Sequence, residues 1–323
     1  MTQPTNDQLL SCEPDSISAA NRFPHEAMAT VFEIFIVHDN AHYAAQAAQA
    51  AFDELDGIEQ NLSRFIENSD ISQINNLAAG QTLQLGLDAF HCIRLAAQVY
   101  DQTNGAFDIT IGSLLDCWAA EEKTLRKPSS QDIDLARSRT GMGLLKLDEA
   151  SHTVTLATTG VQIDLGGIGK GYAVDRMAEL LTDWSIDTAL ICAGQSSVLT
   201  LGAPPQTKGW PVKLTNPHNH RQSLARFFLQ GEAMSGSGLQ KGYHIIDPRI
   251  SLPIKNKCAA WATAPDAATT DALSTAFMVM APDEIENYCL RRPGTKAMII
   301  LEEENPEKRQ GSVLRFGSWK KAR

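Results

Sequence analysis

The chain has 323 residues, of which 43% are hydrophobic and 20% charged, enough apolar material for one large domain or two closely packed lobes. Its net charge of −10, without a dense cluster of Lys or Arg, argues against a general nucleic-acid binder. No apolar run reaches the roughly 18 residues of a membrane-spanning helix, and no apolar signal-peptide region precedes the fold, so we expect a cytoplasmic protein.

The N-terminal segment, residues 1–22, is polar and is predicted to be disordered or extended. Ordered structure is expected from Phe23, with residues 23–323 forming a single domain. The six cysteines are far apart and include no CxxC pair, which argues against a zinc site or a redox pair. Those in apolar surroundings, such as Cys192, are expected to be small buried hydrophobic residues.

Apolar periodicity predicts a strand over 30–37, helices over 44–58, 70–76 and 87–103, and then a loop over 105–118. A short surface helix is expected within 123–139. Strands are predicted at 144–147, 153–156, 162–165, 188–192, 197–201, 210–214, 225–229, 233–235 and 296–301, and helices at 172–181 and 270–281. One strand, then helices, then strands mostly in series favour an α+β fold with mixed or antiparallel sheets over a doubly wound parallel sheet.

The stretch from Ile163 to Asp175 is the most informative part of the chain. Four glycines fall within six residues (166–171), together with Lys170, between a predicted strand end and a predicted helix. Backbone N–H groups and the helix dipole at such a place favour anions, phosphate above all. The pattern is neither of the common nucleotide-binding motifs, so a tight turn with a solvated lysine is the alternative.

Three further segments carry candidate chemistry. Asp271 and Thr275 are four residues apart, so on a helix they share a face and offer hard oxygen ligands to Mg²⁺ or Ca²⁺. The alternative is helix capping by Thr270 or Asp271. His244 is a candidate general base, although a lone histidine is more often structural. Asp108 could cap a helix or face a ligand.

Together and in this order, these segments resemble the flavin transferase family, the ApbE-like FAD:protein FMN transferases. The matching motifs span about residues 25 to 300. They are Met28-Ala29-Thr30, Ser63-Arg64-Phe65 with 69–75, Gly105-Ala106-Phe107-Asp108-Ile109-Thr110, 164–171, Ser235-Gly236, His244-Ile245-Ile246-Asp247-Pro248 and 271–275.

The resemblance implies a fold of two intimately associated lobes around an FAD cleft, and an enzyme that binds FAD and a divalent cation, usually Mg²⁺ with Ca²⁺ or Mn²⁺ possible. Such enzymes move FMN onto a Thr or Ser hydroxyl of an acceptor protein and release AMP. By motif, Asp271, Thr275 and the Gly167 carbonyl would hold the metal. Catalysis would fall to His244, as base, and Lys170. The residues that would line the FAD site are Met28, Ala106, Phe107, Asp108, Asp164, Lys170 and Ile245.

Four positions depart from the family pattern: Ala29 and Gly169 replace a Gly and an Ala, Gln195 replaces an acid, and Tyr243 replaces a His. They put catalytic rate in question more than flavin binding. Two alternatives therefore stand beside FMN transfer: a metal-dependent FAD pyrophosphatase that gives FMN and AMP, and a flavin-binding protein without turnover.

Overall fold

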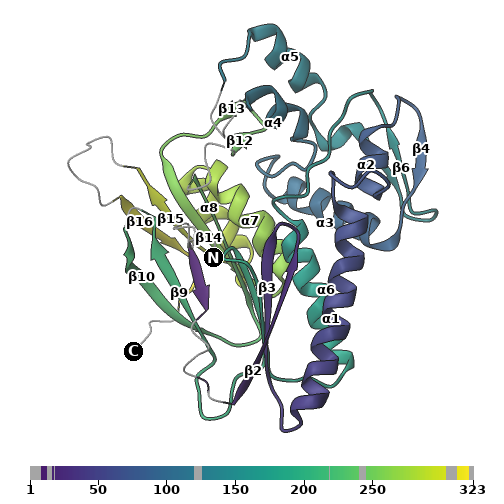
Figure 1. Ribbon diagram of the computed structural model, residues 1–323. Coiled ribbons are helices and arrows are strands. Elements are labelled where there is room, and N and C mark those ends of the chain that lie inside the picture. Colours follow the sequence, from purple (N-terminus) through teal and green to yellow (C-terminus); the bar gives the residue numbers. More distant parts are fainter. Residues whose placement is uncertain are drawn as a thin grey trace.

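The computed structural model describes residues 9–12, 17, 19–119, 126–217, 219–239, 245–302 and 311–319. At its centre lies an eight-stranded sheet in which every neighbouring pair of strands is antiparallel (Figure 1). The predicted α+β fold is therefore confirmed. In spatial order its strands are β16 (Ser312–Phe316), β15 (Lys296–Leu301), β14 (Lys257–Ala264), β11 (Ala233–Gly238), β8 (Ser197–Leu201), β7 (Ala189–Ala193), β3 (Thr30–Val37) and β2 (Ala20–Ala27).

The inner strands of this sheet are apolar on both faces. In β3, Ile34 and Ile36 belong to one hydrophobic cluster and Phe35 to another. In β7, Ile191 points into the first cluster, whereas Leu190 points into the second. Side chains alternate across a strand, so burial on both faces requires a continuous apolar run. That is why these strands stand out in the sequence.

Three helices cover the first face, namely α1 (Ala41–Leu62), α6 (Gly169–Asp183) and α7 (Ala267–Val279). Helix α1 buries a stripe of alanines with Leu55 and Ile58, and begins where the Asn40 side chain accepts a hydrogen bond from the Tyr43 amide. At the far end of α7, the buried Lys257 of β14 donates to the carbonyl oxygens of Phe277, at 3.0 Å, and Met280.

A smaller antiparallel sheet covers the second face. It consists of β1 (Leu10–Cys12), β9 (Trp210–Asn216) and β10 (Asn219–Leu229). The backbone carbonyl of Leu9 accepts hydrogen bonds from the Trp261 indole, at 3.2 Å, and the Thr215 amide, at 3.1 Å. Part of the segment predicted to be disordered or extended is thus a strand packed into the core.

The remaining elements lie around the helical face. They are α2 (Asp70–Asn75), β4 (Thr82–Gln84), α3 (Leu87–Gln102), α4 (Gly112–Trp118), α5 (Ser130–Ser138), β5 (Leu145–Asp148), β6 (Thr153–Leu156), β12 (Ile246–Asp247), β13 (Leu252–Pro253) and α8 (Pro282–Arg291). Helices α4 and α5 lie with β12 and β13 at the upper end of Figure 1. The described part of the chain has no helix that is both long and apolar enough to span a bilayer.

Several predicted elements need correction. The loop expected over 105–118 contains α4, and residues 162–165 form no strand, only an isolated bridge between Gln162 and Ile111. Helix α7 begins at Ala267 with Asp266 as its cap, so neither Thr270 nor Asp271 caps it. Strand β14 was missed because four of its eight residues are alanine, which has a low β-propensity.

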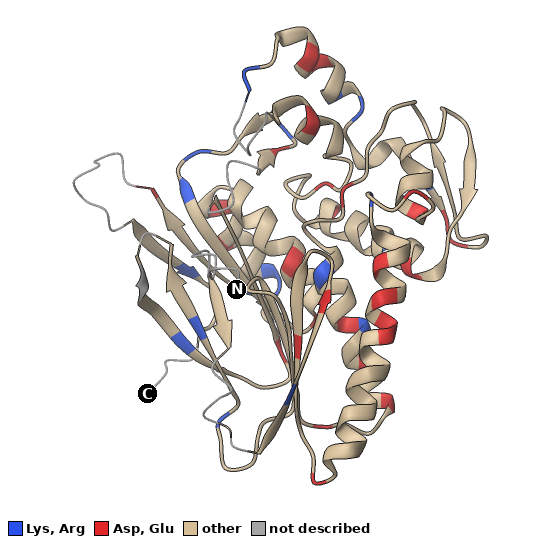
Figure 2. Cartoon of the chain, in the orientation of Figure 1, with Lys and Arg blue, Asp and Glu red and all other residues tan. Residues whose placement is uncertain are grey.

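Charge is distributed unevenly over this fold. Acidic residues gather along α1, whereas Lys and Arg are scattered singly over the described elements (Figure 2).

Candidate functional site

The candidate site is built where α6 and α7 approach each other closely. A Cβ placed on Gly171 would lie 2.2 Å from the Ala267 carbonyl oxygen, so only glycine fits there. One turn along α6, the Asp175 carboxylate accepts hydrogen bonds from the amides of Ala267, at 2.7 Å, and Ala268, at 2.8 Å. Helix α6 therefore supplies both the contact surface and a cap for the first turn of α7.

Asp271 faces α6 from the second turn of α7 and is only 3% exposed. Its Oδ2 accepts a hydrogen bond from the Gly171 amide at 3.1 Å and lies 3.5 Å from Lys170 Nζ. Its Oδ1 accepts a hydrogen bond from the Ser197 hydroxyl at 3.2 Å. Because a buried carboxylate needs such partners, these three groups fix its orientation.

Thr275 lies one helical turn beyond Asp271 and faces the glycine-rich turn. A Cβ built on Gly167 would lie 3.1 Å from Thr275 Oγ1 and 3.2 Å from Phe107 Cε2. The Ser237 hydroxyl is also 3.2 Å from Thr275 Oγ1. The structure thus brings together Gly167, Asp271 and Thr275, the three residues expected to bind a metal.

The donor set around Asp271 suits a hard cation. A carboxylate, a hydroxyl and a peptide carbonyl are all oxygen ligands, and the absent side chain of Gly167 leaves room between Thr275 and Phe107. Among the described residues no group of three or more His, Cys, Asp and Glu could hold a metal. A cation here would complete its shell with water and phosphate oxygens, as Mg²⁺ commonly does.

Lys170 lies in the first turn of α6, a helix that begins without a side-chain cap. Its ammonium group donates a hydrogen bond to the Gly166 carbonyl at 3.0 Å in addition to its ion pair with Asp271. Lys170 is therefore not the solvated surface lysine of the alternative interpretation. Its charge and the N-terminal dipole of α6 make this turn favourable for an anion.

Asp164 joins the glycine-rich turn to the 105–110 segment. Its backbone amide donates to the Ile109 carbonyl at 2.7 Å, and its carboxylate accepts from the Gly166 amide at 2.7 Å and from Arg64 at 2.9 Å. Arg64 also pairs with Asp116 at 3.2 Å. The Ser-Arg-Phe motif at 63–65 thus acts through its arginine, which fixes Asp164.

The 105–110 segment is buried. Ala106 is 2% and Phe107 4% exposed. Asp108 accepts hydrogen bonds from the Thr110 amide, at 2.8 Å, and hydroxyl, at 2.6 Å. Burial raises the pKa of the Asp108 carboxyl to about 6, although these hydrogen bonds favour its charged form. Asp108 is thus a buried acid held by its own turn.

The other predicted FAD-site residues lie in different elements. Met28 occupies the turn between β2 and β3 at φ = 49°, and its amide donates to Glu59 at 2.8 Å. Ile245 is 6% exposed and belongs to the same hydrophobic cluster as Phe107. His244 and Tyr243 lie outside the described residues.

Three of the four departures from the family pattern can be located. Ala29 has φ = 56°, a left-handed conformation that glycine adopts without strain, which fits the Gly of the family pattern at this position. A Cβ on Gly169 would meet only Leu165 Cβ, at 3.6 Å, so either residue fits. Gln195 is exposed in the turn between β7 and β8.

Sequence reasoning missed several residues that support Asp271. Asp175 lies in an ordinary helix, so no local pattern marks its capping role, whereas Ser197 lies in a buried, mostly apolar strand. Ser235 belongs to the weak Ser-Gly match, and its hydroxyl lies 3.1 Å from that of Ser197 and 2.8 Å from that of Thr270. A polar residue inside an apolar strand was the signal available for both serines.

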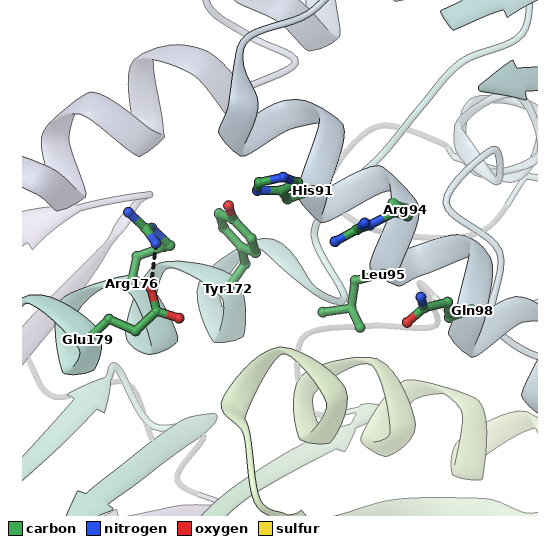
Figure 3. Close-up of a pocket in the computed structure, with 7 residues that line it drawn as sticks. All are labelled: His91, Arg94, Leu95, Gln98, Tyr172, Arg176 and Glu179. Atoms are coloured by element: carbon green, nitrogen blue, oxygen red, sulfur yellow. Dashed lines mark hydrogen bonds and ion pairs between the residues drawn. The ribbon is translucent and has the colours of Figure 1, made fainter. Parts of the chain in front are cut away.

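A cavity of about 220 Å³ lies between α3 and α6 (Figure 3). Its lining includes His91 and Arg94 from α3, and Tyr172, Arg176 and Glu179 from α6. Arg176 forms ion pairs with Glu179 and with Glu54, while the Tyr172 hydroxyl donates to Asp88 at 2.9 Å. Arg176 and Tyr172 are thus already paired with acidic neighbours.

Comparison with known proteins identifies the family. The family model described as the ApbE family matches residues 28–299. The chain belongs to the ApbE family. Escherichia coli K12 has an ApbE relative named FAD:protein FMN transferase, which is 26% identical over 293 residues, 86% of this chain and 83% of the relative. A Salmonella typhimurium relative of the same name is 25% identical over 315 residues, 91% of this chain and 89% of the relative.

Solved ApbE structures share the fold. The crystal structure of the ApbE protein from Thermotoga maritima has a TM-score of 0.80 and 27% identity, and the match covers 92% of this chain and 97% of that one. The apo flavinyl transferase ApbE of Pseudomonas stutzeri also has a TM-score of 0.80, at 24% identity, with 92% and 94% covered. The predicted family and fold class are confirmed.

Proposed function

We propose that this ApbE-family protein is an FAD:protein FMN transferase that moves FMN from FAD to a Thr or Ser hydroxyl of an acceptor protein and releases AMP. The observation that carries the proposal is the buried Asp271 carboxylate. It is held by Lys170 and Gly171 at the start of α6 and lies one helical turn from Thr275, which faces Gly167. Oxygen ligands and a helix N-terminus at one place suit a cation bound to a diphosphate.

Asp271, Thr275 and the Gly167 carbonyl would hold Mg²⁺, and their oxygen chemistry also suits Ca²⁺ or Mn²⁺. When bound, the cation would neutralise charge on the diphosphate. Lys170 would stabilise the same diphosphate from α6, since its ammonium group lies at the uncapped helix N-terminus. The FAD site would be completed by Met28, Ala106, Phe107, Asp108, Asp164 and Ile245.

Transfer requires that the acceptor hydroxyl lose its proton. The hydroxyl oxygen forms a bond to the phosphorus of the FMN half, and the bond from that phosphorus to the bridging oxygen breaks, so that AMP leaves. We assign the proton to His244, because histidine is the side chain whose ordinary pKa suits a general base near neutral pH. Asp164, fixed by Arg64 and the Gly166 amide, would orient the dinucleotide beside the turn.

Hydrolysis of FAD to FMN and AMP is the second candidate, because water can replace the acceptor hydroxyl in the same site. Binding of FAD without turnover is a third, favoured by the exposed Gln195 where the family pattern has an acid. The retained Lys170, Asp271 and Thr275 support turnover over simple binding. The cytoplasmic location and the single domain over 23–323 stay predictions.

One assay separates these candidates. The protein is incubated with FAD, MgCl₂ and a peptide that carries one acceptor Thr, with a Thr→Ala peptide as the matched control. FMN transfer predicts covalent flavin fluorescence on the Thr peptide and an equal amount of AMP. Free FMN with AMP would indicate hydrolysis, and intact FAD would overturn both catalytic proposals. A His244→Asn variant should lose transfer while it keeps FAD binding.

A further inference from the structure

Cys12 and Cys192 are 180 positions apart in the sequence, yet their thiol sulfurs lie 2.7 Å from each other. Cys12 ends β1 in the small sheet, where it pairs with Val212 of β9. Cys192 lies in β7, where it pairs with Glu33 of β3 and Val198 of β8. The two thiols therefore meet between the two sheets. The absence of a CxxC motif argued against a redox pair, but only the fold brings these residues together.

Both backbones are already held in place around this contact. Strand β1 is fixed by its pairing with β9 and by the hydrogen bonds from Trp261 and Thr215 to the Leu9 carbonyl. Strand β7 is an inner strand of the eight-stranded sheet. A disulfide needs its sulfurs at about 2.05 Å with compatible Cα positions, and the present contact is within about 1 Å of that distance.

We propose that Cys12 and Cys192 are a modification site, at which thiol–disulfide exchange forms an intramolecular bond that joins the two sheets. The oxidant is a disulfide such as glutathione disulfide. The inference is independent of the proposed function, because β1 and Cys192 belong to the cluster on the sheet face opposite α6 and α7.

The exchange has a defined order. Cys192 is 2% exposed, and burial raises the pKa of its thiol well above the usual value, so it is a poor first nucleophile. Cys12 is partly exposed and reacts first. Its thiolate attacks the oxidant disulfide and releases one thiol. Cys192 then gives up its proton and attacks Cys12 Sγ, which releases the second thiol. Two protein thiols become one disulfide, and the oxidant disulfide becomes two thiols.

The new bond would restrain the unfolded chain. It would close a loop over the 180-residue separation, and long closed loops restrict the unfolded ensemble most. It would also tie β1 covalently to the core. The oxidised protein should therefore unfold at a temperature several degrees higher than the reduced protein.

The test uses the full chain equilibrated in dithiothreitol or in glutathione disulfide, followed by alkylation, non-reducing peptide mapping and thermal unfolding. We expect two fewer alkylated thiols after oxidation, a peptide that links Cys12 to Cys192, and a higher Tm that dithiothreitol reverses. Cys12→Ser and Cys192→Ala should each abolish all three effects. Should Cys192→Ala fold poorly, Cys12→Ser still tests the proposal, because it leaves the buried Cys192 unchanged. Cys289→Ala is the control and should retain them.

Three results would overturn the inference. The first is full alkylation of Cys12 and Cys192 after oxidation. The second is a mapped bond to another cysteine or to a second copy of the chain. The third is an equal rise of Tm in the Cys12→Ser variant, because the stabilisation would then have another origin.

Discussion

Helix α6 contributes charged side chains to two regions, the Asp271 cluster at its first turn and the cavity against α3 further along. At the first turn, a buried carboxylate is oriented by a backbone amide, a hydroxyl and Lys170. In the cavity, Arg176 is partly exposed and its charge is met by Glu54 and Glu179. The cavity holds more charged groups than the first turn, so the difference lies in burial and in backbone support. Preorganisation rather than charge distinguishes a candidate site from a solvated cluster.

The largest expected effect comes from removing the charge that the first region depends on. Asp271→Asn should reduce Mg²⁺-dependent AMP release from FAD by roughly 100-fold or more, because a neutral amide binds a hard cation poorly. The measurement is AMP production against MgCl₂ concentration, with circular dichroism to confirm folding. Asp88→Asn changes a carboxylate that contacts α6 in the second region and should retain most activity. Equal losses in both variants would contradict the proposed metal position.

The next effect concerns the close approach of α6 and α7. Gly171→Ala places a methyl group against the Ala267 carbonyl and should lower the free energy of unfolding by about 1–3 kcal/mol or more, while it displaces the amide that holds Asp271. Chemical denaturation and AMP release would both report this change. Gly169→Ala, in the same turn, meets only Leu165 Cβ at 3.6 Å and should be neutral or slightly stabilising. A stable, active Gly171→Ala variant would show that the helices can separate freely.

A smaller effect should appear in the pH dependence of stability. Burial raises the pKa of Asp175 to about 7, so the folded state binds its proton more tightly than the unfolded state. The stability that Asp175 contributes is full below the unfolded pKa and is lost as pH rises through the folded pKa. Wild-type protein should therefore lose stability relative to Asp175→Asn between about pH 4 and about pH 7. Asp266→Asn, which changes the N-cap residue of α7, is the control. A pH-independent difference in the free energy of unfolding between wild type and Asp175→Asn would refute the pKa shift.

The smallest effect is expected in the cavity itself. Arg176→Ala breaks partly exposed ion pairs and should change AMP release by less than about twofold and the free energy of unfolding by about 1 kcal/mol or less. Steady-state kinetics and thermal unfolding would measure this. A large loss of activity would make the cavity part of the working site and would remove the contrast between the two regions.

The sequence contained much of the fold and the main site residues, for physical reasons. Strand β3 and helix α1 have clear apolar periodicity, and α2 lies within the helix predicted over 70–76. Glycines with Lys170, and the four-residue spacing of Asp271 and Thr275, indicated a phosphate turn and an oxygen face. The resemblance to the family then placed the turn and the oxygen face in one site, which no local pattern could do.

The remaining features depend on tertiary contacts. Strand β14 is rich in alanine because α7 packs directly on it, and alanine alone predicts no strand. Asp175 appeared to be an ordinary helical acid, yet it caps a helix 92 positions away. Ser197 and Asp271 are likewise 74 positions apart, and Cys12 and Cys192 are 180 apart, so the sequence alone does not show that they are in contact.

The buried Lys257 at the far end of α7 has a consequence for how this helix responds to pH. Burial lowers the pKa of its ammonium group to about 8, so the stability it contributes increases as pH rises from there towards the ordinary lysine value. The pKa of Asp175, which caps the first turn of α7, is raised instead. Together the two groups leave α7 least stable near neutrality, where both ends carry a charge that burial disfavours.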